Sequence, residues 1–335
     1  MAKKALRIGI AGATGLLGRE LVSVLEADGL PIGDLELFAG DRSLGEDVEF
    51  GGEGLAVRPL PESLVGLDAI VVCTPIGTAL DLVRAALRAE IPCIDCSGSL
   101  ASSPEIPLAL AGLGAHDGLA SAPLISSPPG AALIWAPVLA AIQREVGLRR
   151  VVGSVLTSAS SSGRAGIEAL SEETLALLNQ RDSAIEAESG GPHAFDCHVH
   201  GGRDEPDKEG RAPAEAQLTS ILQRLLGADL RVAATCVHVP TFAGQGASLA
   251  IETQRALSPG RAAEIFATAD GIDLWSEGDA PSTRDAVGAD DVIVGRLRAD
   301  ASLEAGHGLL LWVAGDPLRL AAINAARLLR ARFSV

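Results

Sequence analysis

Short apolar runs alternate with amphipathic stretches over the first 130 residues. The runs predict β-strands at residues 6–11, 35–39, 69–73, 91–94 and 124–126. An amphipathic stretch follows the first run as far as about residue 27, and the clearest helical pattern covers residues 78–89. Strands that alternate with helices are typical of a parallel, doubly wound sheet. We therefore expect a Rossmann-like α/β domain over residues 1–129.

Longer helical patterns and β-rich runs follow residue 128. Helices are predicted at about residues 131–143, 166–179 and 214–226, and strands at 151–156, 232–237, 249–253, 292–297 and 309–314. This pattern predicts a second, α+β domain over residues 130–316. A last amphipathic helix, at about residues 318–330, is expected to pack back on the first domain as part of the segment 317–335. Residues 182–211 are rich in Glu, Asp, Gly and Pro. They are predicted to form a solvent-exposed loop region, with a candidate strand at residues 195–200.

Charge and composition exclude several classes of function. The 335 residues include 27 basic and 43 acidic side chains, a net charge of −16, which disfavours nucleic acid and anionic membranes as partners. Three tryptophans, six phenylalanines and no tyrosine leave little material for base stacking. The longest membrane-like stretch, residues 130–142, contains Pro137 and is shorter than the ~20 residues of a spanning helix. The five cysteines form an odd set that favours free thiols in the cytoplasm.

The glycine-rich turn after the first run is the strongest chemical signal. Gly12, Gly15 and Gly18 follow a predicted strand at a spacing of three and precede a predicted helix. This arrangement allows backbone N–H groups and the helix dipole to hold a pyrophosphate. We therefore expect a dinucleotide against the turn, with Thr14, Leu16 and Leu17 among its contacts. The alternative is a purely structural turn.

The end of the second predicted strand bears on the choice of dinucleotide. Many NAD-binding proteins place one acidic residue there, whereas this chain has Asp41, Arg42 and Ser43. Arg42 and Ser43 can hold a 2′-phosphate and Asp41 opposes one, so NADP is modestly favoured over NAD. The alternative is a polar turn.

Several blocks, in order along nearly the whole chain, resemble aspartate-semialdehyde dehydrogenase. They lie at residues 10–15, 42–43, 126–128, 234–240, 291–298 and 311–316. The resemblance implies a nucleotide domain, a dimerising second domain, a homodimer, and descent from an enzyme that makes the semialdehyde from aspartyl phosphate with NADPH. It also implies further cofactor contacts, at Cys73, Thr74, Ser97, Gly98, Ser160 and Gly163.

The chain departs from this family at the position of the catalytic thiol. The family reaction needs a cysteine nucleophile at a helix start, where the helix dipole favours the thiolate. The matching stretch here runs Ser127, Pro128, Pro129, Gly130, so Gly130 occupies the thiol position. Glycine offers no side chain for a thioacyl intermediate.

The other family side chains are also replaced. Gln245 stands where the acid/base histidine is expected, and an amide does not titrate near neutral pH. His238 stands where an arginine grips the substrate carboxylate, Ala101 matches a second arginine, and a lysine expected near Gln217 is missing. The nucleophile, the base and the cationic side chains that bind the substrate's anionic groups are therefore all replaced. This pattern resembles the Usg-type members of the family.

Two clusters offer replacement chemistry. Cys93 and Cys96 form a Cys-x-x-Cys motif at a strand end, so Cys96 is a candidate for a relocated nucleophile, against the reading of a small buried residue. His193, Cys197, His198 and His200 form a second cluster. On a strand His198 and His200 share a face and Cys197 points away, so only part of this set can converge, and no metal site is predicted.

The sequence therefore supports a leading hypothesis and two rivals. The leading hypothesis is a cytoplasmic homodimer that keeps the nicotinamide-dinucleotide fold, lacks the thiol-dependent apparatus, and acts as a ligand-binding or regulatory relative. The first rival is an active NAD(P)-dependent oxidoreductase on another small carbonyl compound, with His238 or Cys96 recruited, because hydride transfer needs only a positioned substrate. The second is a mixed dimer with an active family member.

Overall fold

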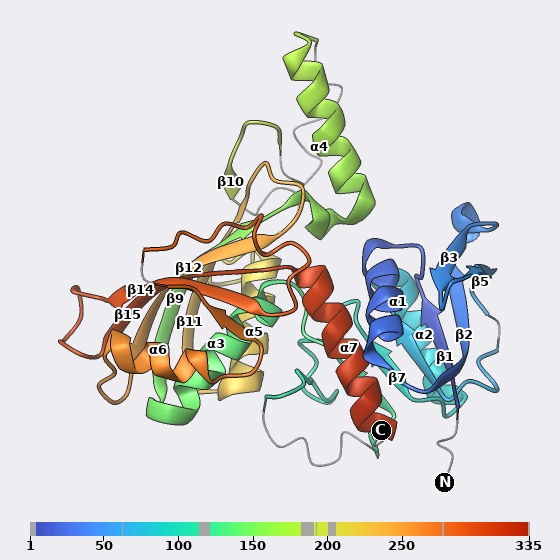
Figure 1. The fold of residues 1–335 in the computed structure, drawn as a ribbon, viewed down its shortest axis with the longest axis horizontal. Helices are drawn as coiled ribbons and strands as arrows, with labels where there is room; N and C mark the ends of the chain where they lie inside the picture. The colour runs from blue at the N-terminus through green and yellow to red at the C-terminus, as the bar shows by residue number, and fades with distance from the viewer. Residues whose placement is uncertain are drawn as a thin grey trace. The chain divides into compact units, whose positions relative to one another are not determined.

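The computed structural model describes residues 5–61, 63–113, 121–181, 191, 193–199, 206–276 and 278–333. The chain forms two compact units (Figure 1). Unit 1 comprises Met1–Pro129 and Leu318–Val335, and unit 2 comprises Gly130–Pro317. The last helix of the chain thus belongs to the unit that contains the N-terminus. Within the described ranges, no helix combines the length and the apolar character that a bilayer-spanning segment requires.

Unit 1 is built on a six-stranded parallel sheet. Its strands are β1 (Leu6–Ala11), β2 (Ile32–Ala39), β5 (Arg58–Pro59), β6 (Ala69–Val72), β7 (Cys93–Asp95) and β8 (Leu124–Ser126), in the order β5-β2-β1-β6-β7-β8. Counted along the sheet this is the order 3-2-1-4-5-6 of dinucleotide-binding folds. The strand order reverses between β1 and β6, so ligands of such sheets bind beyond the carboxyl ends of these two strands. The predicted fold class is confirmed.

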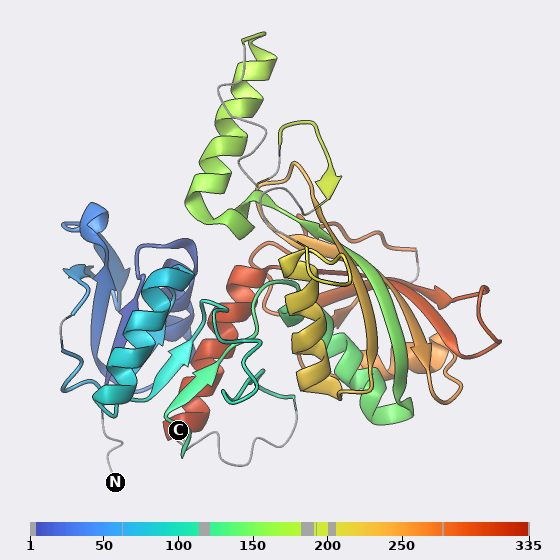
Figure 2. The same cartoon turned by 180° about the vertical axis from the view of Figure 1, so that it is seen from behind.

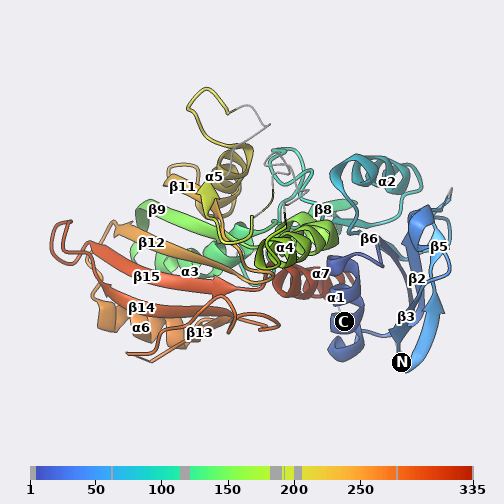
Figure 3. The same cartoon turned by 90° about the horizontal axis from the view of Figure 1, so that it is seen from above.

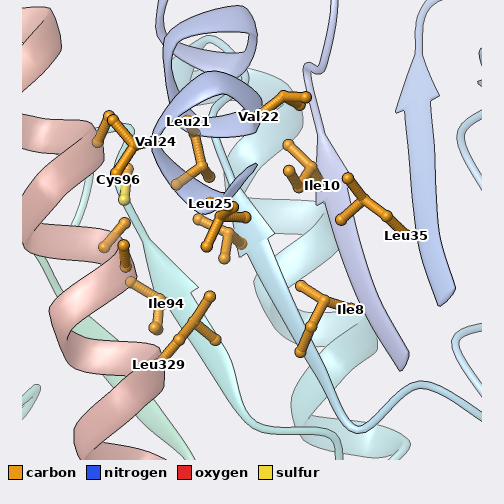
Figure 4. Close-up of a cluster of buried hydrophobic side chains, with 14 of the residues drawn as sticks. Ile8, Ile10, Leu21, Val22, Val24, Leu25, Leu35, Ile94, Cys96 and Leu329 are labelled. Carbon is orange, nitrogen blue, oxygen red and sulfur yellow. The ribbon is translucent and has the colours of Figure 1, made fainter. Parts of the chain in front are cut away.

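Helices cover both faces of this sheet. α1 (Leu16–Asp28) and α7 (Pro317–Phe333) pack on one face, and α2 (Ile76–Arg88) packs on the other (Figures 1 and 2). Figure 4 shows the first of these cores, in which Leu21 and Leu25 of α1 meet Ile8 and Ile10 of β1, and Leu329 comes from α7. The strands β6 and β7 of this sheet are buried on both faces, which explains the apolar runs at residues 69–73 and 91–94.

A small hairpin follows β2. It consists of a 3-10 turn, η1 (Asp41–Ser43), and the antiparallel strands β3 (Asp47–Phe50) and β4 (Glu53–Ala56). These strands are short and mostly exposed, and their polar sequence gave no strand prediction.

Unit 2 is built on a seven-stranded mixed sheet in the order β10-β11-β9-β12-β15-β14-β13 (Figure 3). Its strands are β9 (Leu148–Thr157), β10 (His198–Val199), β11 (Arg231–His238), β12 (Gln245–Thr253), β13 (Ile272–Leu274), β14 (Val292–Ala299) and β15 (Gly308–Gly315). The helices are α3 (Ala131–Val146), α4 (Gly163–Leu178), α5 (Pro213–Leu226) and α6 (Pro259–Ala267). This is the predicted α+β second domain.

One face of this sheet carries three helices. α5 packs on β11, α3 on β9, β12 and β15, and α6 on β13 and β14. Alternate side chains of the four central strands point to the opposite face, where Arg150, Arg231 and Glu252 lie at one end. The other side chains of these rows are half-buried or exposed and uncharged. They are Val152, Ser154, Leu156, Ala233, Thr235, Val237, Ser248, Ala250, Leu310 and Trp312. We call this set the outer face.

The region around β10 corrects one prediction. A strand was expected at residues 195–200, but β10 covers only His198 and Val199, and His200 lies outside the described residues. Phe195 has φ of +61°, a left-handed conformation that interrupts a strand. α4 extends away from the sheet in Figures 1 and 2, and Leu170 and Glu173 are its only buried residues.

Candidate functional site

Gly12 in the turn after β1 and Gly18 in the following helix have no room for a side chain. Gly12 has φ of +86°, and a Cβ atom on it would lie 2.7 Å from the carbonyl oxygen of Cys73. A Cβ atom on Gly18 would lie 2.2 Å from the carbonyl oxygen of Gly12. The two glycines thus give a tight turn and bring α1 directly against it.

The first turn of α1 lies just beyond the carboxyl end of β1. Gly15 precedes the helix in an extended conformation, and the first intrahelical bond runs from the Arg19 N–H to the Gly15 carbonyl. Within the described residues no side chain caps this turn and no acidic residue lies in it. The N–H groups of Leu16, Leu17 and Gly18 therefore have no partner inside the helix, which suits an anion.

Thr74 lies opposite the glycine turn with an unsatisfied hydroxyl. Its backbone nitrogen would be 3.1 Å from a Cβ atom on Gly12, and its Oγ1 is buried without a hydrogen bond among the described residues. A buried polar group left in this state costs about 1–3 kcal/mol, which a ligand oxygen would recover. α2 begins two residues later, after Pro75, and its first turn likewise has no side-chain cap. These groups fit a pyrophosphate-containing dinucleotide.

The turn after β2 carries the residues that bear on the 2′ position of a ribose. The Thr14 hydroxyl donates to Ser43 Oγ at 2.9 Å, which ties η1 to the glycine turn. Arg42 is exposed in the middle of η1, and no ion pair of its guanidinium is found in the described part of the chain.

A buried carboxylate organises the loop after β7. Asp95 is fully buried and accepts hydrogen bonds from the Ser97 N–H at 3.0 Å and the Ser97 hydroxyl at 2.5 Å. The Ser99 hydroxyl donates to its other oxygen at 3.3 Å. A Cβ atom on Gly98 would lie 2.9 Å from Pro129, so this loop packs against the segment that leads to α3. The predicted contacts Ser97 and Gly98 are thus held at the sheet edge, whereas no feature of the sequence indicated the role of Asp95.

The surroundings of Cys96 do not activate its thiol. Cys96 belongs to the apolar core that Figure 4 shows, whereas Cys93 packs in the core on the opposite face. A hydrogen bond with Cys73, followed by burial, raises the pKa of Cys96 well above its usual range. Burial raises the pKa of Cys93 as well. A nucleophilic thiol needs the opposite shift.

In unit 2, Gly130 starts α3 in a conformation reserved for glycine. Its φ and ψ are 52° and −129°, and among the described residues no side chain caps the helix and no atom lies within 4 Å of a Cβ atom placed on Gly130. α3 packs on β9 and ends at Val146, directly before β9 begins at Leu148. The two elements therefore run antiparallel, and Gly130 lies toward the end of β9 at Thr157.

Three side chains form a row at that end of the sheet. His238 pairs with Thr157, and Gln245 lies one residue beyond the Gly246–Leu156 pair, so His238, Thr157 and Gln245 occupy one column on the helix-covered face. His238 is 3% exposed and Gln245 is 5% exposed. The Oε1 of Gln245 is buried without a hydrogen bond among the described residues. The family positions named from the sequence thus share one edge of unit 2.

Three imidazole rings lead from α4 to this row. Glu173 Oε1 lies 3.3 Å from His193 Nδ1, and its Oε2 accepts the N–H of Ala194 at 2.7 Å. The rings of His193 and His198 are 5.1 Å apart, as are those of His198 and His238. Cys197 is exposed. No group of three metal-binding side chains occurs in the ranges that the structure covers. The sequence groups His193 with His198 but does not connect them to Glu173 or His238, because the four residues lie on a loop, two strands and a helix.

A serine-rich turn at residues 158–163 also lies at this end of the sheet. The hydroxyls of Ser158 and Ser160 lie 3.1 Å apart and both residues are buried. Gly163 follows with φ of +70° and begins α4. Of the remaining family positions, Ala101 is fully buried in unit 1 and Gln217 lies on α5.

Comparison with known proteins relates both units to one family. Residues 7–119 match the family model described as "Semialdehyde dehydrogenase, NAD binding domain". Residues 139–320 match "Semialdehyde dehydrogenase, dimerisation domain". The aspartate-semialdehyde dehydrogenase of Aquifex aeolicus is 29% identical over 331 residues and covers 96% of each chain. A USG-1 protein homolog of Azotobacter vinelandii is 30% identical over 335 residues, with 97% of this chain and 96% of that protein covered.

Solved structures give the same result. Aspartate semialdehyde dehydrogenase II from Vibrio cholerae superposes with a TM-score of 0.91 at 27% identity, covering 98% of both chains. An aspartate semialdehyde dehydrogenase from Candida albicans, solved with NADP, has a TM-score of 0.74 at 15% identity and shares the fold.

Proposed function

Because the chain belongs to the semialdehyde dehydrogenase family, we propose that it binds a nicotinamide dinucleotide but does not perform the thiol-dependent reaction of aspartate-semialdehyde dehydrogenases. It acts instead as a ligand-binding or regulatory member of the family. The observation that carries this proposal is Gly130 at the start of α3. Glycine supplies no nucleophile there, and a cysteine in the same backbone conformation would be strained.

Gln245 and His238 support the same proposal. Acid/base catalysis contributes about 10² to 10⁴ in rate, and the amide of Gln245 cannot supply it. His238 replaces a guanidinium that is always charged and grips a carboxylate with two parallel hydrogen bonds. The row retains polar groups for a small ligand, but not the set that the family reaction requires.

Two features of unit 1 support the choice of cofactor. The α1 start, the α2 start and the Thr74 hydroxyl together fit a pyrophosphate. When bound, a nicotinamide dinucleotide would supply a hydride acceptor or donor. Exposed Arg42 and the tethered Ser43 favour NADP over NAD, because both can donate hydrogen bonds to a 2′-phosphate.

Calorimetric titration tests this preference. Arg42→Ala removes one charge-assisted contact, so NADP affinity should fall about tenfold while NAD affinity stays unchanged. Arg58→Ala is the control, since Arg58 is also exposed, lies on the edge strand β5 and pairs with Glu36. Equal losses for NAD and NADP would contradict the assignment of Arg42.

We also propose a homodimer through the outer face of unit 2. The side chains of the outer face are uncharged, Arg150, Arg231 and Glu252 lie at its margin, and the three helices pack on the opposite side of the sheet. Contiguous apolar surface of this kind marks protein interfaces.

The cytosol is the proposed location, because all five cysteines are free.

A direct assay tests the central claim. The purified protein should bind NADP in a calorimeter and show no phosphate-dependent oxidation of aspartate semialdehyde above background. Turnover of about 1 s⁻¹ or more, the ordinary range for enzymes, would refute the claim.

A second candidate function, oxidoreduction of another small carbonyl compound, is favoured by the buried imidazole of His238 at the end of the histidine row. A substrate screen that follows NADPH absorbance distinguishes the two, and His238→Gln should abolish any activity found.

A further inference from the structure

Two cysteines lie side by side at the carboxyl edge of the unit 1 sheet. β6 and β7 are parallel neighbours, and Val72, the last residue of β6, pairs with Asp95, the last residue of β7. Cys73 and Cys96 are the next residues of each chain segment, and the Cys96 N–H donates to the Val72 carbonyl. Neighbouring strands lie about 4.7–4.9 Å apart, within the Cα separation that disulfides span.

Both side chains point to the same face of the sheet. Cys96 belongs to the core beneath α1 and α7, and Cys73 packs against that core. Cys73 is near enough to Cys96 to raise the pKa of its thiol, and neither cysteine forms a disulfide. Cys93, the other member of the Cys-x-x-Cys motif, lies on the opposite face and cannot reach Cys96. The partner of Cys96 is therefore a residue 23 positions upstream, which the motif spacing does not reveal.

We propose that Cys73 and Cys96 form a redox modification site, which hydrogen peroxide closes into a reversible disulfide. Cys73 is the more accessible of the two, so its sulfur attacks the peroxide. The O–O bond breaks, a sulfenic acid forms on Cys73, and one oxygen leaves as water. The sulfur of Cys96 then attacks the sulfenic sulfur, the S–O bond breaks, and a second water leaves with the Cys96 proton. Two thiols are oxidised and one peroxide is reduced to two waters.

The burial of Cys96 suits it to the second step. Cys96 as a residue is 9% exposed, so it is shielded from direct oxidation, yet it belongs to the core against which Cys73 packs. A nearby resolving thiol diverts a sulfenic acid into a disulfide before further oxidation occurs.

Disulfide formation bears on the dinucleotide site through the backbone of Cys73. The Cys73 N–H donates to the Ala11 carbonyl, and the Cys73 carbonyl forms the wall that excludes a side chain at Gly12. A disulfide that draws Cys73 toward Cys96 would move the Cys73 carbonyl relative to Gly12. The oxidised protein should therefore bind NADP less tightly, an effect that rests on the proposed dinucleotide binding.

Peptide mapping tests the disulfide itself. The reduced full-length protein is treated with hydrogen peroxide, its remaining thiols are alkylated under denaturing conditions, and the peptides are identified by mass. We expect a peptide pair linked through Cys73 and Cys96 that dithiothreitol separates. Cys73→Ser should abolish this pair, whereas Cys93→Ser, the matched control on the other face, should leave it intact. Recovery of Cys96 as a free thiol beside a Cys73 sulfinic acid would overturn the proposal.

Calorimetry on the same samples tests the consequence. NADP affinity should fall at least about tenfold on oxidation, because donor–acceptor distances tolerate only a few tenths of an ångström, and reduction should restore it. Disulfide formation with unchanged affinity would refute the coupling. If the reduced protein does not bind NADP at all, the proposed function fails while the modification site stands on the peptide map.

Discussion

Gly12 and Gly130 show two different reasons for a glycine. At Gly12 the space for a side chain is filled by the Cys73 carbonyl, whereas at Gly130 the space is open and the backbone angles are the constraint. Replacing Gly130 by cysteine therefore meets no atom, but it costs about 1–3 kcal/mol in backbone strain. The backbone at Gly130 is therefore unfavourable for a cysteine, although the space beside it is open.

Gly12→Ala tests the glycine turn. The new Cβ would lie 2.7 Å from the Cys73 carbonyl, so the turn must shift and NADP affinity should fall on the order of 10- to 100-fold by calorimetry. Gly29→Ala is the matched control, because Gly29 has φ of +70° but no atom within 4 Å of the added carbon. Both variants bear backbone strain, and only Gly12→Ala should lose affinity. A similar loss in both would assign the effect to stability.

At the scale of elements, α7 ties the chain's end into unit 1 through one amide. Asn324 is 2% exposed, and its side chain accepts the Ala111 N–H at 2.7 Å. It donates to the Ala109 carbonyl at 3.0 Å and to Ser127 Oγ at 2.8 Å. Ala322, Ala325 and Leu329 complete the apolar face of the helix. The amide thus fixes the register of α7 against the loop before β8 and the residue after it.

Asn324→Ala should destabilise the protein. The Ala111 N–H and Ala109 carbonyl lose their partner, and each buried unpaired group costs about 1–3 kcal/mol, so the free energy of unfolding in urea should fall by about 2–4 kcal/mol. Arg327→Ala, at an exposed position of the same helix, should change it by less than about 0.5 kcal/mol. A loss of that small size for Asn324→Ala would show that water replaces the amide.

The predictability of each element follows from its burial. β1, β8 and α7 were predicted to within a few residues because buried faces leave a clear apolar pattern. β3, β4 and the first residues of β12 were missed because their residues are polar or small. These segments are strands because they pair with neighbouring strands, which an apolar pattern does not reveal. The glycine turn and the row of His238 and Gln245 were named from the sequence. Asp95 and the contact of Cys73 with Cys96 depend on register between strands, which spacing along the chain does not encode.

At the scale of the whole molecule, Ala250→Arg tests the outer face. Ala250 lies at its centre on β12, so a cation there should separate the proposed dimer and halve the mass measured by light scattering. Ala267→Arg on α6 makes the same change at an exposed position on the helix-covered side and should leave the mass unchanged. A dimer that survives Ala250→Arg would place the interface elsewhere.

Buried thiols give the stability a dependence on alkaline pH. Burial raises the pKa of Cys236 to about 12, and the pKa values of Cys93 and Cys96 are raised too. The unfolded chain releases these protons near pH 8.5 and the folded chain retains them, so stability is full below that pH and falls as the pH rises. The loss should be about 1 kcal/mol per thiol between pH 8.5 and 9.5, measured by urea unfolding. Cys236→Ala should reduce the slope by about a third, and an unchanged slope would contradict this origin.

The position of α7 also dictates when unit 1 can be finished during synthesis. Its core needs Ala322 and Leu329, which leave the ribosome only after the whole of unit 2 has been made. Domains generally fold as they emerge, so the nucleotide-binding half waits, with one face of its sheet incomplete, while the intervening half folds. A chain released early by a nonsense codon near residue 317 would therefore expose apolar surface and be a target for chaperones and proteases.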